Sequence, residues 1–298
     1  MPLSPLLLAC LAATWLIWGS TYLAIKFALT SFPPFYQMGS RFLVAGALLL
    51  GWLWFSGRAL PTLTEWRNAL IIGTLLLVSG MGFTAYSEQT VASGLIVAYI
   101  AIIPIIVTAM NLPLGIKPSR LELCGMLVGV AGVLMLVRGE AFSGSRTGLA
   151  AITIACVSWS LGSVLSPRLP LARGAMGFAS EMLCGSVLLL ALAAAVGERP
   201  EWPPQPLAAW SWLYLVVFGS LLAFNAYMIL LGRVSAALAS SYTFVNPVIA
   251  MTLGIWLGGE TVSAFEWSAA AVITAGVVLL VIGRQPAPTH PRRTRNHP

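Results

Sequence analysis

Charged side chains are scarce in this 298-residue sequence: Asp, Glu, Lys and Arg make up 8% of it, whereas 58% is hydrophobic. A soluble domain carries about 25% charged residues, so this chain has too little polar surface to face water on all sides. That excludes most soluble enzymes and nucleic-acid-binding proteins. The net charge of +7 does not indicate nucleic acid either, because the basic residues stand singly at the ends of apolar runs. This pattern is typical of proteins that orient themselves in a bilayer.

Aspartate is absent, and all nine acidic residues are Glu. Mechanisms that need an Asp pair, an aspartyl phosphate or an Asp-rich metal site are therefore excluded. The two histidines, His290 and His297, lie in the polar C-terminal tail, and the sequence has no HExxH zinc motif and no GxxxxGK[ST] nucleotide loop. We therefore expect neither a bound metal nor a cofactor.

Cysteine is also rare, and the four cysteines are far apart in the sequence. Each falls within an apolar run, where a free thiol packs as a small hydrophobic group rather than pairing or binding metal. These residues are Cys10, Cys124, Cys156 and Cys184.

What the sequence does contain is ten apolar stretches that can cross a bilayer, since a spanning helix needs roughly 20 apolar residues. The first is too long, and is followed by too many others, to be a cleaved signal peptide. The connections are short, and the basic, Pro-rich tail 284–298 is expected to be disordered. The sequence thus predicts an all-α polytopic protein whose main partner is the lipid bilayer. The ten expected spans are 5–29, 35–55, 67–88, 91–114, 119–138, 147–168, 174–196, 209–231, 234–258 and 264–283.

The distribution of Lys and Arg predicts the orientation. Eleven of the sixteen lie on the side shared by both termini, and five lie on the other side. Cytoplasmic loops carry the excess of basic residues, so both termini are expected in the cytoplasm. Seven of the eleven lie outside the tail, so the excess remains without it.

The two halves of the sequence resemble each other. VASGLIVAYIAIIP (91–104) and VSAALASSYTFVNP (234–247) share a Tyr and a Pro at an offset of 143 residues. An AGV block recurs at 131 and 275, an offset of 144, and a Gly-Ser pair recurs at 19 and 162, again at 143. We interpret these matches as one repeat covering 1–140 and a second covering 147–283.

A repeat of five spans has an odd number of crossings, so the second copy must cross the membrane in the opposite sense. The prediction is therefore two inverted five-helix repeats with a site near the bilayer midplane between them. Gly125 and Gly129 form a GxxxG pattern, which indicates a close helix crossing or a homodimer contact.

Two segments stand out, WLIWGSTYLAIKFAL (15–29) and SYTFVNPV (241–248). Together with several shorter segments they resemble the EamA family of the drug/metabolite transporter superfamily, with the greatest likeness to a group of bacterial inner-membrane permeases. The resemblance covers almost the whole chain except the C-terminal tail. It implies a carrier that exports small metabolites, such as amino-acid-like or amphipathic compounds, with coupling to protons. The segments are WLIWGSTYLAIKFAL (15–29), PP and RFLVAG within 33–46, GSVLS (162–166), SEML (180–183), FGSLLAFNAYM (218–228), ALASSY (237–242), SYTFVNPV (241–248) and GGE (258–260).

Ionisable groups inside spans are costly, and this makes them functional candidates. Glu181, seven residues into the seventh span, is the preferred proton-binding group, and it can also bind an ammonium group; Glu88, at the end of the third span, is the second candidate. Either could instead serve packing or reach the interface. Arg41 could bind a substrate carboxylate or neutralise a Glu across the cavity, or act as an interfacial anchor.

Most of the eleven Trp lie near span ends, as in an aromatic belt. Trp18 and Trp159 differ because they lie in mid-span, each next to a Gly-Ser pair. Together with Tyr22, Tyr99 and Tyr242 they could form an amphipathic wall of a substrate cavity, although packing in the core is an equally good interpretation.

Asn225 and Asn246 are mid-span amides that must find partners in the protein interior. Pro104 and Pro247 occupy equivalent repeat positions and each removes a backbone N–H, so we expect helix kinks that either flex during transport or shape the packing.

The leading hypothesis is a secondary carrier that works by alternating access. A passive facilitator or channel of the same fold is the alternative, because the sequence does not separate the two. A membrane enzyme would need an unusual Glu- or Cys-based chemistry, since the spans contain no Asp, no His and no GxSxG motif.

Overall fold

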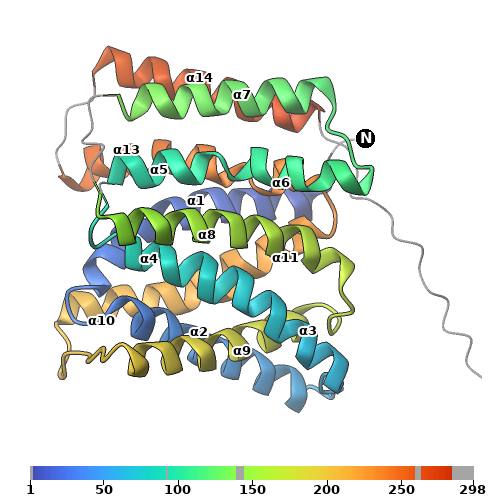
Figure 1. Ribbon diagram of the computed structural model, residues 1–298, viewed down its shortest axis with the longest axis vertical. Coiled ribbons are helices and arrows are strands. Elements are labelled where there is room, and N and C mark those ends of the chain that lie inside the picture. The colour runs from blue at the N-terminus through green and yellow to red at the C-terminus, as the bar shows by residue number, and fades with distance from the viewer. Residues whose placement is uncertain (1–2, 92, 139–143, 259–262, 284–298) are drawn as a thin grey trace, which may run out of the picture.

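The computed structural model describes residues 3–91, 93–138, 144–258 and 263–283 (Figure 1). Within these ranges the regular secondary structure is helical, and the one β-contact is an isolated bridge between Val91 and Gly144. The predicted all-α class is confirmed. The expected tail, 284–298, lies outside the described residues.

The helices fall into two series along the chain. The first comprises α1 (Pro5–Ala28), α2 (Pro34–Phe55), α3 (Leu63–Gly73), η1 (Thr74–Gly82), α4 (Phe83–Ser87), α5 (Ser93–Ala101), α6 (Ile103–Asn111), η2 (Leu112–Leu114) and α7 (Arg120–Leu136). The second comprises α8 (Arg146–Leu165), η3 (Ser166–Arg168), α9 (Ala175–Ala195), α10 (Pro206–Tyr214), η4 (Leu215–Phe224), α11 (Asn225–Leu231), α12 (Ala236–Ala239), α13 (Tyr242–Gly258) and α14 (Ala264–Gly283).

Nine helical stretches in the described residues are long and apolar enough to cross a membrane. They coincide with nine of the ten expected spans. The remaining expected span, 119–138, corresponds to α7, which has 17 residues. A helix of this length extends about 26 Å at 1.5 Å per residue, somewhat short of the roughly 30 Å hydrocarbon core.

Local sequence signals set where two of the spans begin. The third starts at Leu63 rather than at 67 because Thr62 and Glu65 form a capping box. The eighth starts at Pro206 rather than at 209, since a proline in the first helical turn needs no hydrogen-bond partner for its nitrogen.

The helices form a layered bundle in which α1 and α8 occupy the middle (Figure 1). The pair α7 and α14 closes one side of the bundle, and the pair α2 and α9 packs together at the opposite side. Helix α8 packs against η1, α4 and α6, whereas α1 packs against η4, α11 and α13. The two central helices therefore have matching sets of neighbours, each drawn from the other half of the chain.

Helices α7 and α14 run antiparallel along a seam of small residues. A methyl group on Gly125 would lie 2.7 Å from the carbonyl oxygen of Gly276, and one on Gly132 would lie 2.8 Å from the nitrogen of Ile273. Farther along, Gly283 meets Leu121. The GxxxG pattern thus makes a close crossing within the chain, the first of the two predicted roles.

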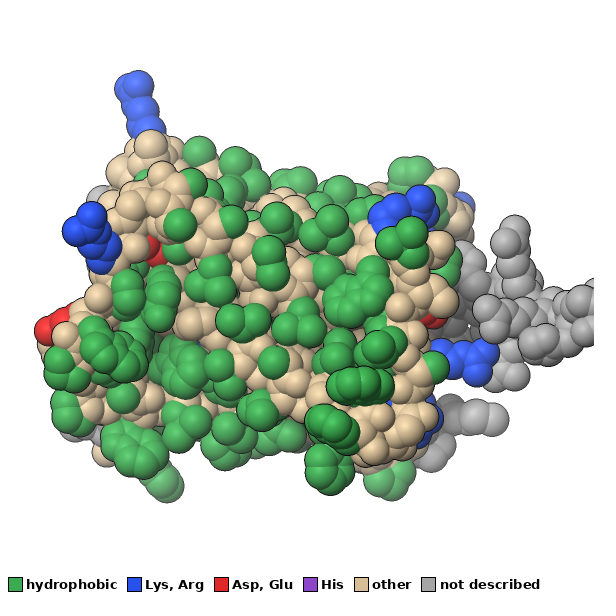
Figure 2. Space-filling view, turned by 90° about the horizontal axis from the view of Figure 1, so that it is seen from below, with side chains coloured by type: hydrophobic (Ala, Val, Ile, Leu, Met, Phe, Trp, Pro, Cys, Tyr) green, Lys and Arg blue, Asp and Glu red, His purple; other side chains and the backbone are tan. Residues whose placement is uncertain are grey.

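The outer surface is apolar. Figure 2 shows hydrophobic side chains over the middle of one face, with Lys and Arg toward its two ends. Large apolar side chains are exposed on the surface, among them Leu48, Leu127 and Val187, and such exposure is unfavourable in water. In a bilayer they face lipid, as expected for a spanning bundle.

Candidate functional site

A cavity lies among the central helices, and its volume open to a water-sized molecule is about 80 Å³. One water molecule needs roughly 10–15 Å³ on this measure, so the space suits a small organic molecule. The lining comes from both halves of the chain. The lining residues are Trp18, Thr21, Ile25, Met38, Gly80, Met81, Thr84, Ala85, Glu88, Ile100, Ile103, Ala155, Cys156, Trp159, Tyr242 and Asn246.

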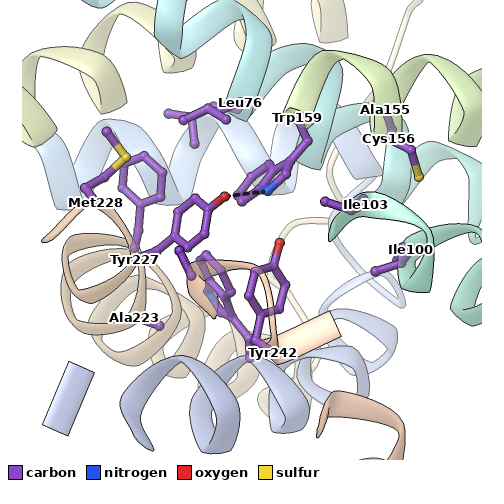
Figure 3. Packing of buried hydrophobic residues seen from close by; sticks show 14 of the residues in the cluster. Leu76, Ile100, Ile103, Ala155, Cys156, Trp159, Ala223, Tyr227, Met228 and Tyr242 are labelled. Atoms are coloured by element: carbon purple, nitrogen blue, oxygen red, sulfur yellow. Dashed lines mark hydrogen bonds between the residues drawn. The ribbon is translucent and has the colours of Figure 1, made fainter. Parts of the chain in front are cut away.

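The end of the cavity at mid-helix is formed by packed aromatic rings. Trp18 lies edge-on to Tyr242, with centroids 4.6 Å apart, and to Trp159, with centroids 5.7 Å apart. The ring centroid of Tyr227 lies 5.2 Å from those of both indoles, and Figure 3 shows its hydroxyl pointing at Trp159. Edge-to-face geometry at these distances is favourable for aromatic pairs. The structure therefore brings together three of the aromatics predicted for the cavity wall.

Tyr227 was not among the site residues predicted from the sequence. Hydrogen bonds fix the position of its side chain. Its hydroxyl accepts from Nε1 of Trp159 at 3.1 Å and lies 2.6 Å from Oγ of Ser163. A signal for it does exist: FNAY (224–227) repeats FTAY (83–86) at an offset of 141. That offset also relates Trp18 to Trp159.

Each central tryptophan contacts a π-helix of the opposite half. Nε1 of Trp18 donates to the carbonyl of Gly219 in η4 at 3.4 Å. The indole of Trp159 lies against Gly80 in η1, where an added methyl group would meet Cε3 at 2.8 Å. Glycine is needed at Gly80 because any side chain would collide with this ring. Short π-helical segments inside α-helices occur frequently at functional sites.

Several hydrogen-bond donors of the cavity-lining residues bond to the protein itself and therefore do not point into the cavity. Oγ1 of Thr21 donates to the carbonyl of Trp18, and Oγ1 of Thr84 donates to the carbonyl of Gly80, both at 2.8 Å. The two indole N–H groups also have partners, as described above. By contrast, Oε1 of Glu88 and Oδ1 of Asn246 are buried acceptors with no hydrogen-bond partner among the described residues.

Arg41 and Glu88 are near enough for their charges to interact, yet no N–O distance of 4.0 Å or less joins them in the described structure. Arg41 is 1% exposed, and its Nε and Nη1 have no partner there. Its Nη2 lies 3.8 Å from Sδ of Met81. Met81 lines the cavity and Arg41 does not, so the guanidinium lies behind the cavity wall.

Glu181 is fully buried in α9, and neither of its carboxylate oxygens has a hydrogen-bond partner in the described part of the chain. Its backbone oxygen packs against Gly73 of α3, 2.6 Å from where a methyl group would stand. It is not among the residues that line the cavity. The structure thus places Glu88 at the cavity and Glu181 in the interface between α9 and α3.

Two other predicted residues also lie outside the cavity lining. Asn225 donates through Nδ2 to the carbonyl of Leu221 at 2.5 Å, so this amide is bonded within its own helix. Tyr99 is partly buried and packs against the core. Tyr22 was also predicted for the cavity wall, and its side chain lies outside the described part of the structure.

The two prolines have different surroundings. Pro104 lies in the first turn of α6, directly after the helix break at Ile102 that separates α5 from α6. Pro247 lies within the continuous helix α13, and the break in that span occurs earlier, at 240–241. The break near Pro104 follows from the missing N–H and the ring of proline, which do not fit a helix interior.

Bilayer-length apolar helices around a cavity of this size define a polytopic membrane protein with a central space large enough for a small molecule. The described residues contain no cluster of three or more His, Cys, Asp or Glu that could hold a metal. The chain belongs to the EamA-like transporter family, whose model matches residues 3–138 and, separately, 146–282. The predicted family is therefore confirmed, and the protein is a membrane transporter and not an enzyme.

Relatives with similar sequences are also named as transporters. The chain is 42% identical over 286 residues to the uncharacterized inner membrane transporter YedA of Escherichia coli, covering 96% of this chain and 94% of the relative. It is 26% identical to an uncharacterized transporter of Synechocystis sp., covering 91% and 88% of the two chains. A solved crystal structure with 21% identity superposes with a TM-score of 0.77 and covers 93% of this chain and 96% of the other, which shows a shared fold.

Proposed function

We propose that this protein is a secondary transporter that exports a small metabolite across the bacterial inner membrane by alternating access, with coupling to protons. The observation that carries the proposal is the central cavity, whose wall is built by both halves and which ends at the aromatic group Trp18, Trp159, Tyr227 and Tyr242. The family and the relative named as an inner membrane transporter support the cellular location.

The architecture proposed for this function is ten spans, α7 included, in two inverted repeats, 1–140 and 147–283. Several features support it. The family model matches twice, once in each half. Helices α1 and α8 start 141 residues apart, as do α2 and α9, and the π-helices η1 and η4. The pairs α7–α14 and α2–α9 run antiparallel, since Gly39 meets Leu190 whereas Gly46 meets Leu183. Corresponding helices of an inverted repeat run in opposite senses.

Alternating access requires the halves to move against each other. The reciprocal contacts of Trp18 with η4 and of Trp159 with η1 support a role for the π-helices in this motion. Each contact joins a central aromatic to the half that it does not belong to. The helix break before Pro104, together with Pro247, supplies flexing points on either side of the cavity.

In this mechanism the cavity lining binds the substrate through Trp18, Trp159, Tyr242 and Asn246, with Tyr227 holding Trp159 in place. Tyr22, Tyr99 and Asn225 are proposed to contribute when the cavity opens to the other side. Arg41 balances the charge of Glu88 across Met81.

Glu181 is the proposed coupling group, and Glu88 is the second candidate. A buried carboxyl group without a partner gains or loses a proton only together with a change in its surroundings. Movement of α3 against α9 would supply that change at Glu181. Both termini are proposed to lie in the cytoplasm. The transport proposal does not depend on the homodimer that the GxxxG pattern also predicts.

The test uses two native cysteines. Cys156 lines the cavity, whereas Cys124 is exposed on α7. Two variants, each keeping one of these cysteines and replacing the other three by Ala, are reconstituted into vesicles and treated with a membrane-permeant maleimide. Flux is measured with a panel of radiolabelled amines, amino acids and carboxylates.

Flux of at least one compound should be blocked by labelling Cys156 and unaffected by labelling Cys124. Acceleration by an imposed proton gradient supports coupled export, whereas flux that is independent of the gradient supports a passive facilitator. Absence of flux across the whole panel, or flux that persists after Cys156 is fully labelled, would contradict the proposal.

A further inference from the structure

Several hydrogen-bond donors of the cavity wall already have partners on the protein, whereas the one charged group of the described wall is an acceptor. Four donors of the wall have partners on the protein: the indole N–H groups of Trp18 and Trp159, and the hydroxyls of Thr21 and Thr84. The oxygens of the two threonines keep lone pairs that can still accept. These four groups therefore have no free hydrogen to donate to a ligand.

Two buried acceptors in the same cavity have no partner among the described residues. These are Oε1 of Glu88 and Oδ1 of Asn246, and Asn246 is 3% exposed. Leaving a buried acceptor unpaired is unfavourable by about 1–3 kcal/mol, more for a charged group. A ligand that donates a hydrogen bond to the carboxylate of Glu88 would reduce this cost at that residue.

Charge points in the same direction. None of the described lining residues is Lys, Arg or His, and Glu88 is the one carboxylate among them. Arg41 lies behind Met81, so an anionic ligand in the cavity would not touch its guanidinium. A cation would reach the carboxylate of Glu88 directly.

The aromatic end complements an apolar body next to the charge. The faces and edges of Trp18, Trp159 and Tyr242 accommodate a ring, and indole is the strongest cation–π partner among the side chains. On α1 the lining runs from Trp18 to Ile25, which is about 10 Å along the helix axis at 1.5 Å per residue. That length accommodates one ring with a short chain.

We infer that the substrate is a small amphipathic organic cation, a protonated amine attached to an aromatic or apolar body, with its ammonium group on Glu88 and its body against Trp18, Trp159 and Tyr242. This inference rests on the proposed transport function and names its substrate class. A transporter of metabolites could equally carry amino acids or carboxylic acids. The inference favours organic amines over these two classes, because amino acids and carboxylic acids present a carboxylate for which the cavity wall has no charged partner.

The first experiment compares four probes that share a phenyl ring: phenethylamine, phenylalanine, 3-phenylpropanoic acid and 2-phenylethanol. Binding to the full-length protein in lipid nanodiscs is measured by calorimetry at neutral pH. Phenethylamine should bind at least about tenfold more tightly than phenylalanine, a difference of about 1.4 kcal/mol, and the acid should bind most weakly. Tighter binding of the zwitterion or of the acid than of the amine would overturn the inference.

The second experiment assigns the charge recognition to Glu88. E88Q should weaken phenethylamine binding about tenfold or more while leaving 2-phenylethanol unchanged, because only the charge is lost. E65Q, which makes the same chemical change in an exposed capping box at the start of α3, should bind all four probes as the wild type does. Unchanged amine binding by E88Q would exclude Glu88. If E88Q does not fold, the order of the four probes on the wild type still decides the substrate class.

Flux measurements with labelled probes in vesicles separate this inference from the proposed function. If the protein binds phenethylamine but transports none of the probes, the cation site is supported and the transport proposal is contradicted. If the protein transports phenylalanine or the acid but not the amine, the transport proposal is supported and the inferred substrate class is contradicted.

Discussion

The indole nitrogen of Trp159 donates to the hydroxyl of Tyr227 at 3.1 Å, and the same hydroxyl lies 2.6 Å from Oγ of Ser163. Ser163 in turn donates to the backbone oxygen of Trp159. The three side chains form a closed set in a buried region, where each bond is stronger than in water and each loss is costly. Tyr227 therefore fixes the orientation of a ring that forms the end of the cavity.

Replacing Tyr227 by Phe should lower stability and transport together. The indole N–H of Trp159 loses its acceptor, at a cost of about 1–3 kcal/mol, and the ring is free to tilt into the cavity. The apparent melting temperature should fall by a few degrees, and substrate affinity should weaken.

The matched control is Tyr86→Phe. Tyr86 occupies the corresponding place in FTAY, and its hydroxyl forms no hydrogen bond within the described structure; its ring stacks on Phe35. Equal effects of the two substitutions on melting and affinity would contradict the role given to Tyr227.

Replacing Gly276 by Ala should destabilise the α7–α14 pair. The added methyl group would stand 2.6 Å from the nitrogen of Gly129 and 2.9 Å from the oxygen of Gly125, both backbone atoms that cannot move without separating the helices. Overpacking of this kind costs about 1–3 kcal/mol. Thermal unfolding in detergent measures the loss.

Gly51→Ala serves as the control, because Gly51 is also within a helix but has no atom within 4 Å of the added methyl group. This substitution should be neutral or slightly stabilising, since alanine favours the helix. Gly276→Ala protein that unfolds at the wild-type temperature would show that the seam is looser than the structure has it.

Much of the fold was predictable because a membrane span requires a run of apolar residues, which is visible in the sequence. Nine of the ten expected spans coincide with bilayer-length helices in the described residues. Breaks inside spans were less visible. Pro104 indicated one, but the break at 240–241 lies seven residues before Pro247, and the π-helices η1 and η4 have no marker beyond their glycines. These features depend on packing against other helices rather than on local residues.

The candidate site shows the same limit. Mid-span position gives the depth of a residue in the membrane but not the direction in which its helix faces. Trp18 and Trp159 were predictable because the repeat places both at one depth beside Gly-Ser pairs. Glu181 also lies inside a span, yet its backbone packs against α3 and the residue is not part of the cavity lining. Helix rotation is set by how α9 packs between its neighbours, which the sequence of α9 alone does not contain.

The orientation can be tested with reporter fusions. Fusions after residues 62 and 117 should report cytoplasm, and those after residues 143 and 203 should report periplasm, because the basic residues concentrate on the side of the termini. Activities of a phosphatase and a fluorescent protein at each position give the answer. An alternating error along the chain would contradict the two five-span repeats, whereas uniform inversion would contradict only the charge argument.

Glu198 should stabilise the contact between the two halves. This residue lies in the loop between α9 and α10, and its carboxylate accepts from the backbone nitrogens of Phe35 at 3.2 Å and Tyr36 at 2.7 Å. Both nitrogens belong to the first turn of α2, where a negative charge is favourable. Glu198→Ala should cost about 1 kcal/mol, as loss of a helix cap does.

The neighbouring Arg199 is exposed, so Arg199→Ala should leave the melting temperature unchanged. Glu198→Gln should lie between the two, because its amide oxygen can still accept one bond. Equal melting temperatures for Glu198→Ala and Arg199→Ala would rule out a stabilising contact.

Glu181→Gln should separate proton coupling from substrate movement. The substitution keeps the shape of the side chain and removes the group that binds the proton. Net export of a transported amine driven by a proton gradient should fall strongly, whereas exchange of the same amine at equal concentrations on both sides should persist, since exchange need not complete a proton cycle. Glu181→Asp keeps the charge and withdraws it by one methylene, so its effect should be milder.

A structural role for Glu181 predicts a different outcome. Its carboxylate is buried and its backbone packs against α3, so a packing role would make Glu181→Gln either nearly silent or harmful to folded yield and to every transport mode alike. Both modes are therefore measured on the same vesicle preparation and normalised to folded protein. Undiminished gradient-driven export by folded Glu181→Gln would remove this residue from the coupling mechanism. Glu88, whose unpartnered oxygen lies at the cavity, would then be the group to test in the same way.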